Sequence, residues 1–178
     1  MNERVVGPFD PLAIIGVLNA HGVRFIVIGG IAAGVQGAMW ATTDLDIVYA
    51  RDRDDHARLA DALAELGAEP VDLPRGVRVS LDAAALATGD VWTLMTRHGR
   101  LDLLGEPAPG LRYPTLAERA RTIRGEQTYL VASIADLIGM KRAAGRPKDL
   151  AQVDLLEATA EELARLDDGA LSSGTDMG

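Results

Sequence analysis

Two aspartates separated by one residue, Asp44 and Asp46, stand at the start of an apolar run that continues to Tyr49. In a β-strand, side chains alternate between the two faces, so both carboxylates would project from the same side. Two anions held this close repel each other unless a cation lies between them. Because carboxylate oxygens are preferred ligands of hard divalent cations, the Asp-x-Asp pair indicates a metal site.

Upstream of this pair, an apolar run from Phe25 to Ile28 ends at Gly29-Gly30. Glycine lets a ligand approach the backbone closely, and the N–H groups at a helix start attract anions. We therefore expect Gly29 and Gly30 to hold phosphate beside the metal site. The pattern over 24–49 predicts a strand, a tight turn, a helix and a second strand.

Asp102 is a third candidate, because it stands alone between Leu101 and Leu103 in an apolar segment. A lone carboxylate on such a strand is costly unless a partner satisfies it. It could accept hydrogen bonds from backbone amides at a strand end. The alternative is that it joins the Asp-x-Asp pair, either as a metal ligand or as the general base for an acceptor hydroxyl.

A second cluster holds four basic residues within eight positions: Lys141, Arg142, Arg146 and Lys148, with Asp149 directly after them. Cations at the end of a helix complement its dipole, so a solvated helix end is one interpretation. Composition alone does not decide between this interpretation and a functional one.

The motif of an apolar residue, Gly29-Gly30, thirteen intervening residues and Asp44-Leu45-Asp46-Ile47 resembles the signature of the polymerase-β-like nucleotidyltransferase superfamily. Over about 24–156 the chain looks most like the minimal nucleotidyltransferases grouped with AbiEii-type toxins. The resemblance implies an α/β (α+β) fold, with a mixed β-sheet flanked by helices and a C-terminal helical segment. It also implies two Mg²⁺ ions and transfer of a nucleotidyl group from an NTP such as ATP to an acceptor hydroxyl.

The same resemblance assigns the site residues. The expected metal ligands and catalytic carboxylates are Asp44, Asp46 and Asp102. AbiEii-like proteins carry a Lys on a helix after the core, then a basic residue, then an Asp at the next helix start, which Lys141, Lys148 and Asp149 match. Lys141 would neutralise charge on the triphosphate and serve catalysis, and Asp149 would orient Lys141 or a group that contacts the base. The expected nucleotide-binding set also includes Gly29, Gly30 and Thr43.

The chain departs from the family pattern at two positions. Many relatives have Gly-Ser where this chain has Gly29-Gly30, so a hydroxyl contact to phosphate is missing and backbone donors remain. Related sequences also commonly place Arg where Trp40 stands here. Nucleotide choice or acceptor handling could therefore differ, and an inactive relative is an alternative.

Apolar periodicity, capping residues and turn residues predict the elements that must position these side chains. We expect helices over 11–21, 31–40, 52–66, 81–87, 116–124, 133–141 and 148–165. We expect strands over 25–28, 44–49, 91–95, 100–104 and 127–131, with an irregular strand within 68–80. The predicted domains are a core over 1–132, a helical segment over 133–166 packed on it, and a disordered tail over 167–178.

Composition fits one globular domain, since the chain has 178 residues, of which 48% are hydrophobic and 25% charged. No apolar run approaches the roughly 20 residues that span a bilayer, and the N-terminus lacks a signal-peptide pattern. We therefore expect a cytoplasmic protein without a membrane partner. The absence of cysteine excludes disulfides and thiolate chemistry. His21, His56 and His98 form no zinc pair and are expected to be ordinary surface or turn residues.

The net charge of −8 argues against a nucleic-acid partner until its distribution is considered. Residues 75–148 carry twelve basic and seven acidic side chains, a net charge of +5, whereas 153–178 carry seven acids and one Arg, a net charge of −6. The basic middle could bind a polyanion locally, or it could be an ordinary solvated surface.

Three functions fit these observations. The leading hypothesis is a Mg²⁺-dependent nucleotidyltransferase that acts as the tRNA-modifying toxin of a toxin–antitoxin system, with a cognate antitoxin protein as partner. Within the same class, a small-molecule nucleotidyltransferase of the antibiotic-resistance kind is the alternative. The third is a catalytically silent binding module on the same fold. A Rossmann dinucleotide site is a weak interpretation, because Gly29-Gly30 lacks the G-x-G-x-x-G spacing.

Overall fold

The computed structural model describes residues 8–71 and 79–173, with side chains described as far as 166. Its helices are α1 (Pro11–Ala20), α2 (Gly29–Gly34), α3 (Arg53–Glu65), α4 (Ala83–Thr88), α5 (Tyr113–Ala117), α6 (Ile134–Ala144) and α7 (Pro147–Ser173). Its strands are β1 (Phe25–Ile28), β2 (Asp44–Tyr49), β3 (Glu69–Pro70), β4 (Val91–Thr96), β5 (Gly99–Leu104), β6 (Arg121–Arg124) and β7 (Thr128–Val131). No helix among these residues is both long and apolar enough to cross a membrane.

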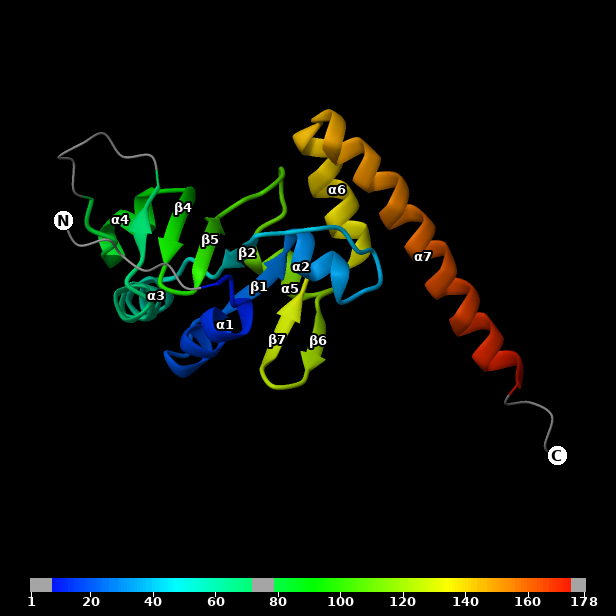
Figure 1. Cartoon of the computed structure of the whole chain (residues 1–178), viewed down its shortest axis with the longest axis horizontal. Coiled ribbons are helices and arrows are strands. Elements are labelled where there is room, and N and C mark those ends of the chain that lie inside the picture. The colour runs from blue at the N-terminus through cyan, green and yellow to red at the C-terminus, as the bar shows by residue number, and fades with distance from the viewer. Residues whose placement is uncertain (1–7, 72–78, 174–178) are drawn as a thin grey trace.

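Within the described residues the strands form one seven-stranded mixed sheet, in the order β3-β4-β5-β2-β1-β7-β6. Two neighbouring pairs are parallel, β2 with β5 and β1 with β7, and the others are antiparallel. Figure 1 shows α1 and α3 together along one side of the sheet, while α6 and α7 lie at another side of the molecule. The predicted mixed sheet flanked by helices, with a C-terminal helical segment, is confirmed.

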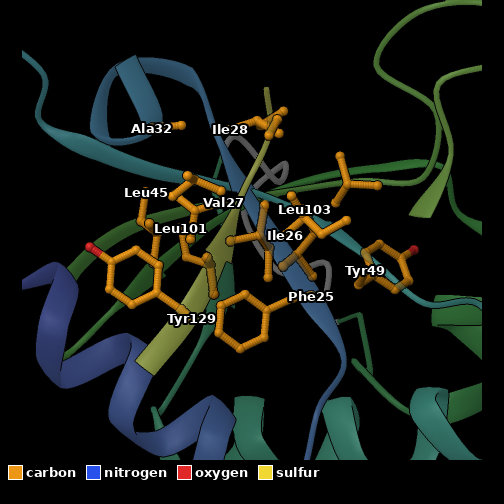
Figure 2. Close-up of a cluster of buried hydrophobic side chains, with 14 of the residues drawn as sticks. Phe25, Ile26, Val27, Ile28, Ala32, Leu45, Tyr49, Leu101, Leu103 and Tyr129 are labelled. Carbon is orange, nitrogen blue, oxygen red and sulfur yellow. The ribbon is translucent and has the colours of Figure 1, made fainter. Parts of the chain in front are cut away.

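The core lies along the central strands. All four residues of β1 are buried, and they pack with Leu45, Leu101 and Leu103 from β2 and β5 (Figure 2). Because side chains alternate along a strand, this burial leaves the intervening residues of β2 and β5 on the opposite face. Burying these aliphatic side chains stabilises the fold and fixes which face of each strand carries the polar residues.

Helix starts follow the capping residues that the sequence predicts. Asp10 accepts a hydrogen bond from the Ala13 amide at 3.0 Å, and Ser133 accepts one from the Asp136 amide at 3.1 Å. Such caps satisfy amide groups that have no partner within the first turn of a helix. These caps explain why α1 and α6 begin where they do.

Two of the expected helices are wrong in part. The helix predicted over 31–40 begins at Gly29 and ends at Gly34, because turns follow and Gly37 has a φ of +102° that no α-helix accommodates. Of the basic helix predicted over 116–124, only residues 116 and 117 are helical, at the end of α5. Residues 121–124 instead form β6, which pairs with β7 as an antiparallel hairpin.

The C-terminal helix also differs from expectation, since α7 begins at Pro147 and runs past Arg165 to Ser173. The predicted tail over 167–178 thus falls partly on this helix and partly outside the described residues. The irregular strand expected within 68–80 is present in part as the short β3, and residues 72–78 of that range lie outside the described residues. Figure 1 shows the far part of α7 extending away from the sheet.

His56 corrects the expectation that the histidines are surface or turn residues. It is buried in α3, with its ring 6.1 Å from that of Tyr49 in an edge-to-face arrangement. Burial lowers the pKa of His56, which favours the neutral imidazole. His56 therefore packs between α3 and β2.

Candidate active site

Three carboxylates converge where β2 and β5 lie side by side in parallel. The register places Asp46 directly opposite Asp102, and Asp44 opposite Arg100. One ligand oxygen from each of Asp44, Asp46 and Asp102 lies within 4.8 Å of the others. The structure thus brings together the three acids that the sequence singled out, on the face of the sheet opposite Leu45 and Leu101.

Gly29 lies directly against one of these acids. It follows β1, whose last residue pairs with Asp46, and its φ of +64° is one that side chains rarely adopt. A Cβ placed on Gly29 would lie 2.1 Å from Asp46 Oδ2, which is an impossible contact. The first glycine of the pair is therefore required by the approach of the Asp46 carboxyl.

Gly30 is required by a different neighbour. A Cβ at this position would lie 2.7 Å from Thr42 Cβ and 2.8 Å from Thr42 Oγ1. The Thr42 hydroxyl in turn donates a hydrogen bond to Asp44 Oδ1 at 2.8 Å. A threonine hydroxyl from the loop before β2 thus lies next to Gly30 and holds one of the three clustered carboxylates, that of Asp44.

The environment of Asp46 disfavours its charged form. Burial, followed by repulsion from Asp44 and Asp102, raises the pKa of Asp46 to about 7, although Lys141 and Arg100 oppose this shift. Withdrawal from water and nearby anions both penalise a carboxylate. A bound cation would offset this penalty and stabilise the charged form of Asp46.

Arg100, which the sequence analysis did not single out, lies among the acids. Its Nε donates to Asp102 Oδ1 at 3.0 Å and its Nη2 donates to Asp102 Oδ2 at 2.9 Å. The same Nε lies 4.0 Å from Asp44 Oδ2. The spacing of Arg100 and Asp102 on a predicted strand was a signal for a shared face, because alternate residues project together.

The second predicted cluster forms around a fully buried carboxylate at the junction of α6 and α7. Asp149 accepts a hydrogen bond from Lys141 Nζ at 3.1 Å and one from Arg146 Nε at 2.5 Å. Burial opposes ionisation of Asp149, but these hydrogen bonds outweigh it and lower its pKa. Asp149 therefore holds Lys141 in place, and Arg146 is a partner that the sequence analysis did not assign.

Lys141 also links this cluster to the loop before β2. Its Nζ lies 5.7 Å from the centre of the Trp40 ring, a distance typical of a cation–π contact. The Trp40 indole nitrogen would lie 3.1 Å from a Cβ on Gly30. Trp40 thus connects the lysine with the glycine turn.

A cavity of about 460 Å³ joins both clusters. Its walls include all nine residues that the sequence analysis assigned to the site, namely Gly29, Gly30, Thr43, Asp44, Asp46, Asp102, Lys141, Lys148 and Asp149. The clustered carboxylate oxygens suit a hard divalent cation, and the lysine and arginine side chains that line the same cavity suit phosphate. The donor set fits the metal and the nucleotide that the family resemblance implies.

A larger cavity, of about 680 Å³, opens near the other ends of β2 and β5. Its walls include Arg24, Arg51 and Arg112, which pair with Asp52, Asp90 and Glu106 respectively. Because these cations are already paired and none of the three clustered aspartates lines this cavity, size alone does not make it the active site.

Comparison with solved structures shows a shared fold. The structure is similar to the lincomycin-bound crystal structure of the lincosamide antibiotic adenylyltransferase LnuA, with a TM-score of 0.57 and 11% sequence identity. The match covers 86% of this chain and 99% of LnuA. A proposed nucleotidyltransferase from Thermotoga maritima matches with a TM-score of 0.46 and 14% identity, over 86% of this chain and 90% of that one. No family model matches the sequence, and no curated protein matches it.

Proposed function

We propose that this protein is a Mg²⁺-dependent nucleotidyltransferase that transfers a nucleotidyl group from an NTP to an acceptor hydroxyl. The observation that carries the proposal is the cluster of Asp44, Asp46 and Asp102, whose ligand oxygens lie within 4.8 Å of one another. The cluster lines one cavity with Lys141 and Lys148, so carboxylates and phosphate-binding cations face the same space. The nucleotidyltransferase fold agrees with this chemistry.

The three aspartates would have different roles in metal binding and proton transfer, according to their positions. Asp44 and Asp46 on β2 would hold the divalent cations, and Asp102 on β5 would ligate with them or accept the proton of the acceptor hydroxyl. Bound there, Mg²⁺ would neutralise the phosphates and polarise the α-phosphate for in-line attack. The close fit of Gly29 against Asp46 keeps that carboxyl in place.

The nucleotide would lie along the basic wall. Lys141, held by Asp149, lines the cavity together with Lys148 and Arg146. These cations would neutralise the triphosphate, and Gly29, Gly30 and Thr43 line the same cavity. Because α2 has only six residues, its dipole adds less to phosphate binding than the expected longer helix would.

A small-molecule hydroxyl is the acceptor class that the observations favour. LnuA, whose structure contains bound lincomycin, shares the fold over 86% of this chain. A tRNA acceptor and a cognate antitoxin remain the second candidate, favoured by the net charge of +5 over 75–148.

A transfer assay with each of the four NTPs, labelled at the α-phosphate, tests the proposal. The purified chain is incubated with Mg²⁺ and either tRNA or a panel of hydroxylated antibiotics. We expect one NTP to label a small-molecule acceptor, Asp46→Asn to abolish labelling, and Asp61→Asn, at an exposed acid of α3, to retain it. Labelling of tRNA, with growth arrest on expression, would instead support the toxin.

The silent-module alternative predicts a different outcome. A protein that binds no nucleotide shows no rise in melting temperature with Mg²⁺ and any NTP, whereas a ligand at about 100 times its Kd stabilises by about 2.7 kcal/mol. Absence of both stabilisation and label transfer would overturn the proposed function.

A further inference from the structure

Arg100 occupies the space between two of the clustered carboxylates. Its guanidinium donates to both oxygens of Asp102, at 3.0 and 2.9 Å, and lies 4.0 Å from Asp44 Oδ2. The register of β2 and β5 enforces this position, because Arg100 lies opposite Asp44 and on the same face as Asp102. The three acids therefore already have a cation of the chain's own.

This placement conflicts with a divalent cation at the same carboxylates. Each oxygen of Asp102 already accepts a charge-assisted hydrogen bond in a forked geometry. A guanidinium and a divalent cation that share these oxygens would lie within a few ångströms of each other and repel strongly. The guanidinium therefore has to leave these oxygens when a divalent cation binds to them.

The Arg100 side chain can move into the adjacent cavity. Its side chain is 43% exposed, and it lines the cavity that also contains Lys141, Arg146 and Lys148. A guanidinium presents a rigid fork of donors that matches the oxygens of a phosphate. The cavity that would receive the phosphates is therefore within reach of the displaced side chain.

We propose that Arg100 is an internal counter-ion that neutralises Asp102 and Asp44 before the metal arrives, and then turns to the phosphates when the metal takes these carboxylates. This inference rests on the proposed function, and it assigns Arg100 as a positioning residue for the metal and a ligand of the phosphate chain. The exchange couples the entry of the cation to the capture of the anion.

The proposal predicts effects of opposite sign in one variant. In Arg100→Gln the competitor of the metal is removed, so Mn²⁺ alone should bind about tenfold more tightly than to wild type. Inorganic pyrophosphate with Mg²⁺ should bind about tenfold more weakly, because the fork that holds it is lost. A residue that merely orients Asp102, or merely supports the fold, would weaken both.

Calorimetric titration of the full chain measures both affinities without any assay of activity. Arg121→Gln, at an exposed arginine of β6, is the matched control and should leave both Kd values within about twofold. Arg100→Lys keeps the positive charge but not the fork, so its Mn²⁺ affinity should stay near that of wild type while pyrophosphate binding weakens. This second variant keeps the test decisive if Arg100→Gln folds poorly.

Two results would overturn the proposal, and they differ. If wild type binds Mn²⁺ and Arg100→Gln binds it equally or more weakly, the counter-ion exchange is wrong while the metal site stands. If wild type binds no divalent cation at all, the proposed function fails and this inference fails with it.

Discussion

Asp46 and Asp102 lie directly opposite each other across the parallel pair β2–β5. The register is fixed by the opposite face, where the buried Leu45 and Leu101 are also partners and pack in the core (Figure 2). A slip of one residue in either strand would turn that strand's acidic side chains into the apolar core. The hydrophobic pattern of two strands thus determines the geometry of the acidic cluster.

The raised pKa of Asp46 predicts how stability depends on pH without metal. The folded chain retains a proton on Asp46 up to a pKa of about 7, whereas the ordinary value is 3.8. The folded state therefore binds more protons than the unfolded state between these values, and the contribution of Asp46 to stability falls as pH rises from about 4 to 7. The loss is at most about 4 kcal/mol.

Urea unfolding in EDTA at pH 4 to 8 measures this contribution as the difference between wild type and Asp46→Asn. We expect the variant to equal wild type near pH 4 and to be the more stable protein at pH 8. Mg²⁺ should restore wild type at pH 8, and Asp61→Asn should follow the wild-type curve. A difference that is independent of pH would show that burial and the neighbouring acids do not perturb Asp46.

Substitutions at Gly30 and Thr42 should have non-additive effects on the free energy of unfolding. In Gly30→Ser the new Cβ would lie 2.7 Å from Thr42 Cβ, and such overpacking typically costs about 1 to 3 kcal/mol. Thr42→Gly removes the obstructing atoms, so the double variant should recover about 1 kcal/mol relative to the sum of the single variants. Strictly additive free energies of unfolding would mean that the two positions do not compete for the same space.

Asp149 should be important for stability as well as for the site. Its carboxylate is fully buried, so Asp149→Asn leaves Lys141 and Arg146 without their counter-ion. We expect a loss of about 2 kcal/mol in chemical unfolding, below the usual cost of breaking a buried pair because Arg146 is largely exposed. Asp154→Asn, at an exposed acid of α7, should change stability by less than about 0.5 kcal/mol. Equal effects of the two variants would contradict the assigned role.

Trp40 should report nucleotide binding through its fluorescence. The chain has two tryptophans, and Trp40 is the one whose ring contacts Lys141 and lines the cavity. When Lys141 turns to phosphate, its contact with the indole changes, so Trp92→Phe should retain a spectral response to Mg²⁺ and pyrophosphate. In Trp40→Phe, the remaining Trp92 should give none. The reverse pattern would place the phosphates away from this wall.

The sequence predicts the local parts of the site well. Asp44 and Asp46 share a face because both lie on one strand, and the run from Phe25 to Gly30 predicts a buried strand that ends in a turn. Asp102 stands out because a lone acid between leucines needs a partner. These inferences depend on alternation along a strand, which operates over a few residues.

What the sequence does not reveal depends on contacts between distant segments. Arg100 gains its role because the parallel pairing sets it opposite Asp44, and no local pattern predicts that pairing. The local pattern of the basic segment 121–124 favours a helix, but the segment forms a strand because it pairs with β7. Thr42 matters because the loop before β2 folds back over Gly30. In each case tertiary packing decides what local propensity leaves open.

Crystals soaked with Mn²⁺ and a non-hydrolysable NTP analogue would show where the metal and the nucleotide bind, because anomalous scattering locates manganese. We expect a peak bound by oxygens of Asp44, Asp46 and Asp102, with the triphosphate extending toward Lys141. A metal and nucleotide bound in the larger cavity beside Arg24 and Arg51, with no peak at the three aspartates, would contradict the proposed function.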